Sequence, residues 1–460
     1  MESKKQKMGL LSCIIMAIGS IIGASIFAST PIAIKIVGGN GIVIGFILAA
    51  LVVVIRTLPE LIMSASLPAN GASYMYLTRL VSPYLGALDA FTQLMIGVLK
   101  IATMALTFAT YFNMLVPSIP VALVAAVCVV VFTIASCFGI RASSLVQNIS
   151  VAVLLVALGL FIFLGLGATK VSFGEVISTT VQLSSLWAAM GIMHGSLIGA
   201  NCLIYAAEDI ERPGRNIPVA FAVSTGLTGV LYAIIAYICV AVMPNFYQID
   251  NLATVAGEFM GPALLTFFIC GGALLAVITS INSAMLMFSR INFSAARDGL
   301  FPYAVYKTNK YNAPVVSLWL IAVMAIIFIV SGFDLDDVVK VTTIPGLLLG
   351  PIMFVSVFMV KRRYPNCYKT SYLRMPHWLA CVLAVVAMGV CISLGYYVLF
   401  QMKPHNWIAM IVYYALASAF TAWRYFYIKK KEGVNLFEKM KSVYEPWEAR
   451  EKAAAEKLAQ

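Results

Sequence analysis

Apolar runs bounded by glycine, proline or charged side chains follow one another along nearly the whole chain. Most of them approach the roughly 20 residues that an α-helix needs to cross the hydrocarbon core of a bilayer. We therefore predict twelve membrane-spanning helices and no separate soluble domain. The predicted helices begin near Met8, Ile42, Leu85, Val121, Leu145, Leu186, Ile217, Pro262, Val315, Val338, Pro376 and Asn406.

Two of these runs, the first and the sixth, are interrupted by glycine. The first contains Gly19 and Gly23, and the sixth contains Gly195 and Gly199. A helix broken inside a bilayer exposes N–H and C=O groups that lipid cannot satisfy, so it is tolerated where it lines a cavity. Glycine can also serve only to let helices pack closely. Two breaks at equivalent positions favour a polar binding site over packing alone.

The spacing of the two breaks predicts an internal repeat. Five spans separate the starts of the interrupted helices, so the second group of five enters the membrane from the opposite face. Inverted repeats of this kind hold substrate near the midplane between paired discontinuous helices. We expect an all-α polytopic membrane protein with a 5+5 inverted repeat and two further helices. The expected divisions are residues 1–168, 186–363, 376–428 and a tail at 429–460.

The charges indicate topology. Only 11% of the residues are charged, yet the net charge is +12, which by itself would be compatible with nucleic-acid binding. If the amino terminus is cytoplasmic, 25 of the 31 Lys and Arg residues fall on the inner side of the predicted membrane. Basic residues concentrate on the cytoplasmic side of membrane proteins. We therefore expect a multi-pass cell-membrane protein with both termini cytoplasmic, lipid as its surroundings and no nucleic-acid partner.

Motifs for several kinds of chemistry are missing. The sequence contains neither a G-x-x-x-x-G-K-[ST] phosphate loop nor an H-E-x-x-H metal motif. The nine cysteines show no C-x-x-C spacing, and most lie in apolar runs, where packing is their expected use. We expect no enzyme activity, no metal or other cofactor and no disulfide-linked partner subunit.

Four motifs occur in order along about three hundred residues. They are G-x-I-I-G-x-x-I-F from Gly19, P-x-x-G-x-x-Y-x-Y from Pro68, Glu208-Asp209 with Pro213, Arg215, Ile217 and Pro218, and A-R-D-G-x-x-P from Ala296 with Asn309 and Pro314. Together they resemble the amino acid, polyamine and organocation transporter superfamily. The resemblance implies a leucine-transporter-like fold of twelve helices that works as a secondary carrier by alternating access.

The chain departs from that pattern at three positions. Ser25 stands where the family usually has glycine, and Ala72 replaces the second glycine of the loop motif. Gly195 occupies a position where several members place a bulky aromatic gate. The pocket is therefore expected to be roomier, or to be gated by another residue.

The helix breaks predict sites for both charges of a zwitterion. Free N–H groups near Gly23 lie at the positive end of the second half-helix, equivalent to about half an elementary charge, which favours a carboxylate. Carbonyls freed around Gly195 and Ile198, with that of Ile21, can accept from an ammonium group. The predicted substrate-binding residues are Ile21, Ile22, Gly23, Ala24, Ser25, Lys100, Thr103, His194, Gly195, Ser196, Ile198 and Asn201.

Two polar residues bear on the substrate side chain. Asn201 stands where some members that carry cationic substrates have an acid, so cationic substrates are disfavoured; Asn201 can also serve only to join two helices. Lys100 lies in mid-span, at a cost of about 3 kcal/mol on insertion scales. It can contact an acidic or polar substrate, replace a coupling cation, or be tied structurally to Glu60 or to carbonyls. These three roles remain open.

Other ionisable groups at membrane depth have simpler explanations. Arg56 and Glu60 are four residues apart on one helical face, which favours a structural pair. His194 can sense protons because its reference pKa is near 6.5, although a lone histidine in a helix is more often a core residue.

Ion coupling rests on the family resemblance. Sodium-coupled relatives hold an ion where Ser20, Thr279 and Ser280 would place hydroxyls beside carbonyls of the first helix. Some proton-coupled relatives use a lysine where this chain has Leu154, which argues against that device. Sodium, another proton carrier and plain exchange remain open.

The sequence as a whole predicts a secondary active transporter, a symporter or exchanger, of amino acids or related small zwitterions. Neutral, polar or acidic substrates are favoured. The alternatives are an exchanger for a cationic or polyamine substrate, and a substrate sensor or channel on the same fold. Residues 445–459 of the tail are expected to form a helix at the membrane surface.

Overall fold

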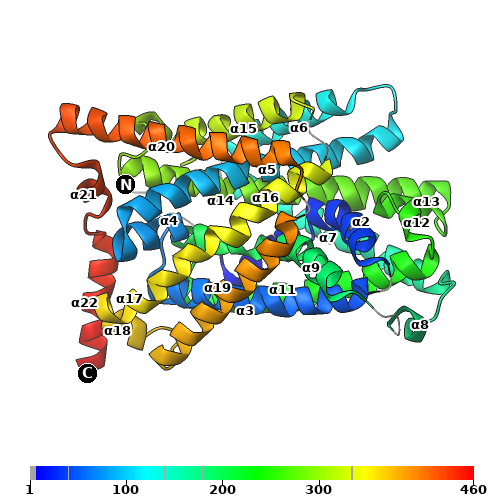
Figure 1. The fold of residues 1–460 in the computed structure, drawn as a ribbon, viewed down its shortest axis with the longest axis horizontal. Helices are drawn as coiled ribbons and strands as arrows, with labels where there is room; N and C mark the ends of the chain where they lie inside the picture. The colour runs from blue at the N-terminus through cyan, green and yellow to red at the C-terminus, as the bar shows by residue number, and fades with distance from the viewer. Residues whose placement is uncertain are drawn as a thin grey trace.

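The computed structural model describes residues 7–39, 41–138, 140–177, 181–332, 335–400 and 402–459. These residues form helices and no β-strand, apart from isolated backbone bridges at Met8–Ile210 and Asn70–Ala206. The predicted all-α class is therefore confirmed. Figure 1 shows long helices that run side by side, with both ends of the described chain at the same end of the bundle. We call this the terminal end.

Eight helical stretches in the described residues are long and apolar enough to cross a membrane. They contain α3 (Ile42–Ser66), α5 (Pro83–Leu115), α7 (Ile140–Gly167), α9 (Leu183–Leu197), α11 (Pro213–Val242), α14 (Leu275–Arg297), α16 (Leu335–Leu348) and α19 (His377–Leu399). Three apolar helices are shorter: α1 (Leu10–Ile21), α6 (Val121–Ser136) and α15 (Val315–Val330). The 29-residue α20 (Pro404–Glu432) completes the set of long helices.

Short helices extend or connect the long ones. They are α2 (Ala24–Val37), α4 (Ala72–Tyr76), α8 (Phe173–Ile177), α10 (Cys202–Tyr205), α12 (Leu252–Gly257), α13 (Pro262–Phe267), α17 (Ser356–Arg363), α18 (Pro365–Lys369), α21 (Leu436–Met440) and α22 (Glu445–Ala459). Proline starts α5, α11, α13 and α20, where its missing N–H costs nothing.

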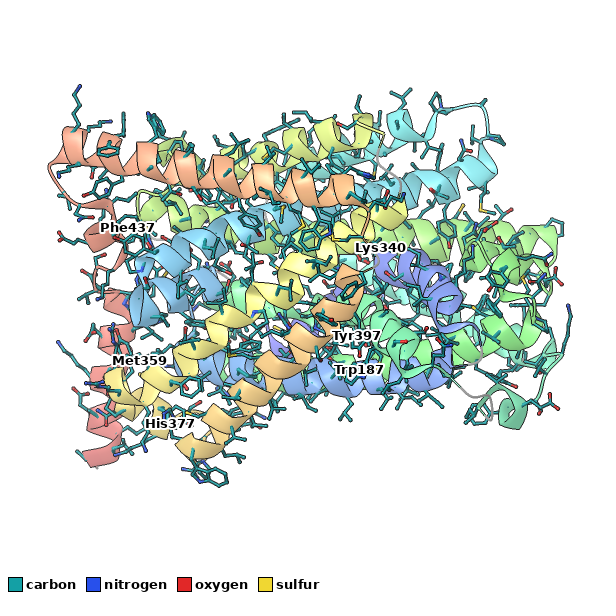
Figure 2. The ribbon with its side chains drawn as sticks, in the orientation of Figure 1. Trp187, Lys340, Met359, His377, Tyr397 and Phe437 are labelled. Atoms are coloured by element: carbon teal, nitrogen blue, oxygen red, sulfur yellow. The ribbon has the colours of Figure 1, made fainter. Side chains whose placement is uncertain are left out.

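The outer surface of the bundle is apolar, as the side chains in Figure 2 illustrate. On α20, for example, Ile411, Leu416 and Phe426 are 65%, 65% and 68% exposed. Large exposed side chains of this kind would be unfavourable in water over so wide an area. Their arrangement matches a protein surrounded by lipid.

Three ion pairs join helix ends and loops that point away from the terminal end. They are Lys35–Asp250 at 3.0 Å, Lys170–Glu258 at 3.2 Å and Lys403–Asp337 at 2.7 Å. Each has a lysine whose side chain is at least one-third exposed. Solvent therefore reaches all three pairs.

The tail forms the predicted helix, and one side of this helix packs on the protein. In Figure 1, α22 crosses the terminal end of the bundle. Trp447 is 1% exposed, stacks on Tyr76 and donates from Nε1 to the carbonyl of Pro68 at 3.2 Å. The Glu451 carboxylate accepts from the amides of Asn366 and Cys367 at 2.9 and 2.8 Å. These contacts seat the apolar anchor of α22 in the protein.

Candidate functional site

The first predicted break is present. The α-helix α1 ends at Ile21 and α2 begins at Ala24, so Ile22 and Gly23 lie between two helical segments. Gly23 has a ψ angle of −156°, far from the helical region, which separates the two segments. The chain thus interrupts its first apolar helix where the glycine pattern predicts it.

The second interruption lies at Gly199, the second of the two glycines in the sixth apolar run. The helix α9 continues through Gly195 and Ser196 to Leu197, and a 3₁₀ turn at Ile198–Asn201 joins it to α10. Gly195 itself stays in the α-helix, because glycine permits unwinding but does not enforce it. The departure from α-helical geometry begins at Ile198.

The two interruptions contact each other directly. Ser20 donates its hydroxyl to the carbonyl of Gly199 at 2.9 Å. A Cβ atom at Gly199 would lie 2.3 Å from the backbone oxygen of Ser20, so only glycine fits this contact without a shift. Tyr232 of α11 donates to the Ile21 carbonyl at 2.5 Å. That carbonyl, predicted to accept from an ammonium group, keeps one further lone pair for a ligand.

The hydroxyl-bearing residues of α14 lie beside the first break. Thr279 Oγ1 is 2.9 Å from the carbonyl oxygen of Gly19. Ser280 packs against Gly23 so closely that a Cβ there would overlap the serine hydroxyl. The space next to Gly23 is thus occupied by α14, and this glycine serves close helix packing.

A buried cavity of about 140 Å³ lies between α5, α9, α10, α14 and α16. One ordered water needs roughly 10–15 Å³ of such space, so this cavity has room for a small solute. The predicted residues that line it are Ser20, Lys100, Thr103, His194, Gly195, Ile198, Asn201 and Ser280. Five others, Ile21, Ile22, Gly23, Ser196 and Thr279, are not among its lining residues. The side chains of Ala24 and Ser25 lie outside the described residues.

Several lining residues were not predicted. On α5, Gln93 and Ile96 continue the face that carries Lys100 and Thr103. Their separations of three and four residues would have revealed this face from the sequence, given Lys100 as the starting point. The other lining residues missed include Ser29, Cys202, Tyr205, Met287, Phe288, Thr342 and Thr343. A Cβ added at Gly195 would fit without a clash, since it would make an ordinary van der Waals contact of 3.6 Å with the hydroxyl oxygen of Thr343.

Glu60 is held by two neighbours. Its carboxylate pairs with Arg56 at 3.0 Å, which confirms the pairing expected from their spacing. It also accepts from the amide nitrogen of Asn201 at 2.5 Å. Asn201 therefore joins two helices, and its oxygen Oδ1 has no hydrogen-bond partner among the described residues.

Lys100 is not tied to Glu60. Within the described part of the chain, its ammonium group forms no hydrogen bond and no ion pair. His194 also has a ring nitrogen, Nε2, without a partner there. The structural role considered for Lys100 through Glu60 is thus absent, and its head group remains available to a ligand.

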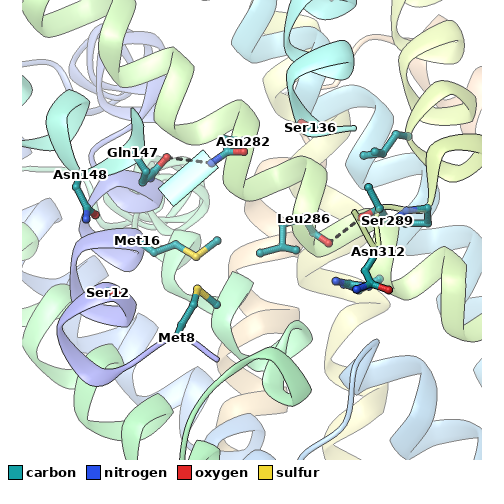
Figure 3. A pocket seen from close by; sticks show the side chains of 14 residues that line it. Met8, Ser12, Met16, Ser136, Gln147, Asn148, Asn282, Leu286, Ser289 and Asn312 are labelled. Carbon is teal, nitrogen blue, oxygen red and sulfur yellow. Dashed lines mark hydrogen bonds between the residues drawn. The ribbon is translucent and has the colours of Figure 1, made fainter. Parts of the chain in front are cut away.

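A second, smaller cavity of about 60 Å³ lies on another face of α1 and α14 (Figure 3). Met8, Ser12 and Met16 line it from the start of the chain's first helix, α1, and two further lining residues are bonded to each other, since Asn282 donates from Nδ2 to Oε1 of Gln147 at 3.2 Å. Because it begins at Met8, this cavity lies nearer the terminal end than the larger one.

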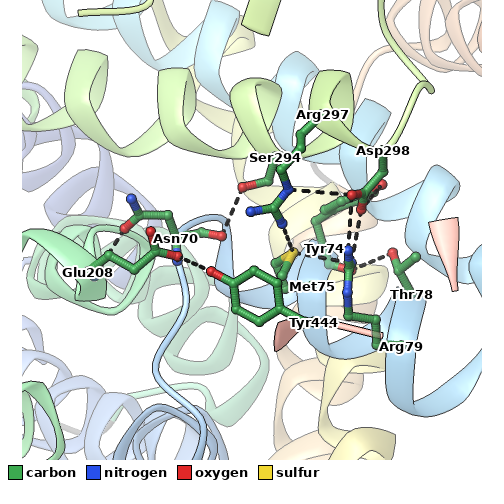
Figure 4. Close-up of polar contacts among 10 residues, drawn as sticks. All are labelled: Asn70, Tyr74, Met75, Thr78, Arg79, Glu208, Ser294, Arg297, Asp298 and Tyr444. Carbon is green, nitrogen blue, oxygen red and sulfur yellow. Dashed lines mark hydrogen bonds and ion pairs between the residues drawn. The ribbon is translucent and has the colours of Figure 1, made fainter. Parts of the chain in front are cut away.

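Polar contacts between the sequence motifs close the terminal end (Figure 4). Arg79 makes a two-pronged ion pair with Asp298, both bonds being 2.9 Å, and Tyr74 donates to the same carboxylate at 3.0 Å. Asn70 and Glu208 exchange backbone-to-side-chain hydrogen bonds at 3.0 and 3.2 Å. Three of the four motifs that carry the family resemblance, those from Pro68, Glu208 and Ala296, therefore meet in space.

Tyr444, just before α22, joins this network. Its hydroxyl donates to Glu208 at 2.6 Å. Burial, and after it the nearby charge of Glu208, raises the pKa of Tyr444 to about 12. The phenol therefore stays protonated at neutral pH and remains a donor to the carboxylate. This residue could not be placed from the sequence, because nothing in the tail indicates its partner.

Interrupted helices that meet beside a buried polar cavity are the construction that membrane transporters use for their substrate sites. The amino acid permease family profile matches residues 8–420, so the chain belongs to this family, within the amino acid, polyamine and organocation superfamily. The family and the relatives below are transport proteins, not enzymes. The chain is a multi-pass membrane protein.

Similar proteins carry several kinds of small solute. A methylthioribose transporter of Bacillus subtilis (strain 168) is 22% identical over 425 residues, covering 88% of this chain and 90% of the relative. A branched-chain amino acid permease, BcaP, of the same organism is 23% identical over 433 residues, covering 89% and 90%. The large neutral amino acids transporter small subunit 2 of Homo sapiens is 26% identical over 355 residues, covering 71% and 65%.

Proposed function

We propose that this protein is a secondary active transporter that moves amino acids or closely related zwitterions across the cell membrane by alternating access. The observation that carries the proposal is the direct contact of the two helix interruptions, through Ser20 and Gly199, beside a cavity with unpaired polar groups. The relatives named for branched-chain and large neutral amino acids support the same class of substrate.

The groups around the cavity suit a zwitterion. The oxygen Oδ1 of Asn201, a residue that lines the cavity, is an acceptor for an ammonium group. The N-terminus of α2 lies behind Ser280, which lines the cavity, so its partial positive charge favours a carboxylate there. Arginine, lysine and polyamines are disfavoured, since no carboxylate lines the cavity among the described residues.

We further propose twelve membrane spans in a leucine-transporter-like arrangement, with the terminal end in the cytoplasm. The basic residues that gather towards this end support the orientation. The cavity extends to Ser29 and Val339, whose helices lead away from the terminal end, while ion pairs close that end. This arrangement supports a state that takes up substrate from the opposite side.

Coupling to Na⁺, coupling to H⁺ and exchange are all compatible with this proposal. Thr279 brings its hydroxyl group to the Gly19 carbonyl of α1, Ser20 bonds the Gly199 carbonyl, and Ser280 lies against Gly23. Oxygen ligands of this kind suit a hard cation. Imposed gradients of Na⁺ or of pH across vesicles distinguish the two ions, and a requirement for internal amino acid identifies exchange.

The test is counterflow in proteoliposomes. Vesicles containing the purified protein are loaded with unlabelled amino acids, and uptake of labelled amino acids is followed against unloaded vesicles. A carrier shows faster uptake into loaded vesicles. Uptake that is indifferent to loading would identify a channel, and binding without any uptake would identify a sensor; either result refutes the proposal.

A further inference from the structure

The ionisable groups that line the larger cavity are unequal in sign. Arg56, Lys100 and His194 line it, and no aspartate or glutamate does so within the described residues. Cys202 and Tyr205 complete its ionisable lining. Arg56 is balanced by Glu60, which does not itself line the cavity, so Lys100 is the cation in these walls that has no carboxylate beside it among the described residues.

The nearby acids are already occupied elsewhere. Glu60 uses one oxygen on Arg56 and the other on Asn201. Asp89 accepts from the hydroxyl of Ser73 at 2.6 Å and from the amide of Gln93 at 3.3 Å. Neither carboxylate is paired with Lys100.

Neutral neighbours do not replace a counter-charge. The hydroxyl groups of Thr103, Thr342 and Thr343 line the cavity, but each donates to a carbonyl of its own helix at 2.9, 2.7 and 2.8 Å. Their oxygens can still accept a hydrogen bond, but they bring no negative charge. A buried ammonium group is stable when it is paired with an anion. The described part of the protein therefore provides no anion to pair with the ammonium group of Lys100.

We propose that the substrate supplies this partner: it is an acidic amino acid, and Lys100 is the specificity-determining residue that binds its side-chain carboxylate. The proposal rests on the transport function proposed above. The α-amino group would use the acceptor oxygen of Asn201, while the second carboxylate is directed to Lys100 on α5. An anionic side chain would thereby make the occupied cavity electrically more balanced than the empty one.

The experiment compares acids with their amides, which match in size and differ in charge. Competition by aspartate and glutamate, and by asparagine and glutamine, is measured against labelled substrate in proteoliposomes. For the unmodified protein we expect the acids to bind roughly 30-fold or more tightly than the amides, because a buried charge pair is lost with each amide. This comparison needs no variant, so it is decisive even if a substitution impairs folding.

Lys100→Met removes the charge and keeps the length of the side chain. It should abolish the preference for acids and leave affinity for the amides within about threefold, while Lys100→Arg should retain the preference. Lys170→Met, which removes an exposed lysine distant from the cavity, is the matched control and should behave as the unmodified protein.

Three results would overturn this inference while leaving the transport function intact. The first is transport in which amides compete as well as acids. The second is an equal loss of affinity for acids and for amides in Lys100→Met, which would show that Lys100 binds the α-carboxylate that both share. The third is an unchanged substrate profile with altered ion dependence, which would make Lys100 a substitute for a coupling cation. If no amino acid binds or moves at all, the proposed function itself fails.

Discussion

A single methyl group added at Gly199 tests the contact between the two helix interruptions. In Gly199→Ala the new Cβ would lie 2.3 Å from the oxygen, 2.5 Å from the carbonyl carbon of Ser20 and 2.7 Å from the nitrogen of Ile21. All three are backbone atoms, so no side chain can rotate away. To reach an ordinary contact of 3.4 Å, the two segments must separate by about 1.1 Å.

That separation has a calculable cost. Overpacking of a well-packed site costs about 1–3 kcal/mol, and weakening the hydrogen bond from Ser20 to Gly199 adds roughly 0.5–1.5 kcal/mol. We expect Gly199→Ala to lower the stability of the detergent-solubilised protein by about 2–4 kcal/mol. Its midpoint of thermal unfolding should fall by several degrees, and counterflow should fall with it.

The matched control is Gly195→Ala, one turn earlier. Its Cβ would meet only the Thr343 hydroxyl at 3.6 Å, and alanine favours a helix over glycine by about 1 kcal/mol. This variant should unfold at the same temperature or slightly higher, with a smaller cavity. If both variants unfold at the temperature of the unmodified protein, the interruptions do not touch as described and the reasoning is refuted.

Three further substitutions test other contacts. Tyr232→Phe leaves the Ile21 carbonyl without its donor and should cost about 1–3 kcal/mol in thermal unfolding, and an unchanged midpoint would contradict this. Asp298→Asn leaves the Arg79 charge buried without its counter-ion, which should cost about 3–5 kcal/mol of stability. The contacts at the terminal end should therefore loosen, and cysteines introduced there should be labelled faster. Trp447→Ala should free α22, seen as faster tryptic cleavage at its lysines, while cleavage unchanged from the unmodified protein would show that the helix is held in another way.

The helices follow from the sequence because each apolar run is a local feature. The first interruption was placed correctly for the same reason, because the break between α1 and α2 depends on glycines that are close together in the sequence, Gly19 and Gly23. For the second, the sequence predicts an interrupted stretch with two glycines but does not decide between them, since Gly195 tolerates α-helical geometry and neighbouring side chains decide where the turn tightens.

Partners distant in sequence could not be predicted. The sequence offers Glu60 two plausible partners, Arg56 and Lys100, and only the packing of α3 against α9 and α10 selects Arg56 and adds Asn201. Likewise the sequence predicts that residues 445–459 form a helix, but not that Trp447 fits beside Pro68. Propensity sets local geometry, whereas docking depends on surfaces assembled from remote segments.

The two ends of the molecule will respond differently to ionic strength. The pair between Arg79 and Asp298 is shielded from the solvent, with side chains 6% and 5% exposed, whereas Lys170 and Glu258 at the other end are 57% and 44% exposed. At physiological ionic strength charges are screened over about 8 Å, but mainly where water and counter-ions have access. Added salt will therefore weaken the exposed pair between Lys170 and Glu258 first and leave the buried pair between Arg79 and Asp298 nearly unaffected. Salt concentration thus changes the contacts at one end of the protein without changing those at the other.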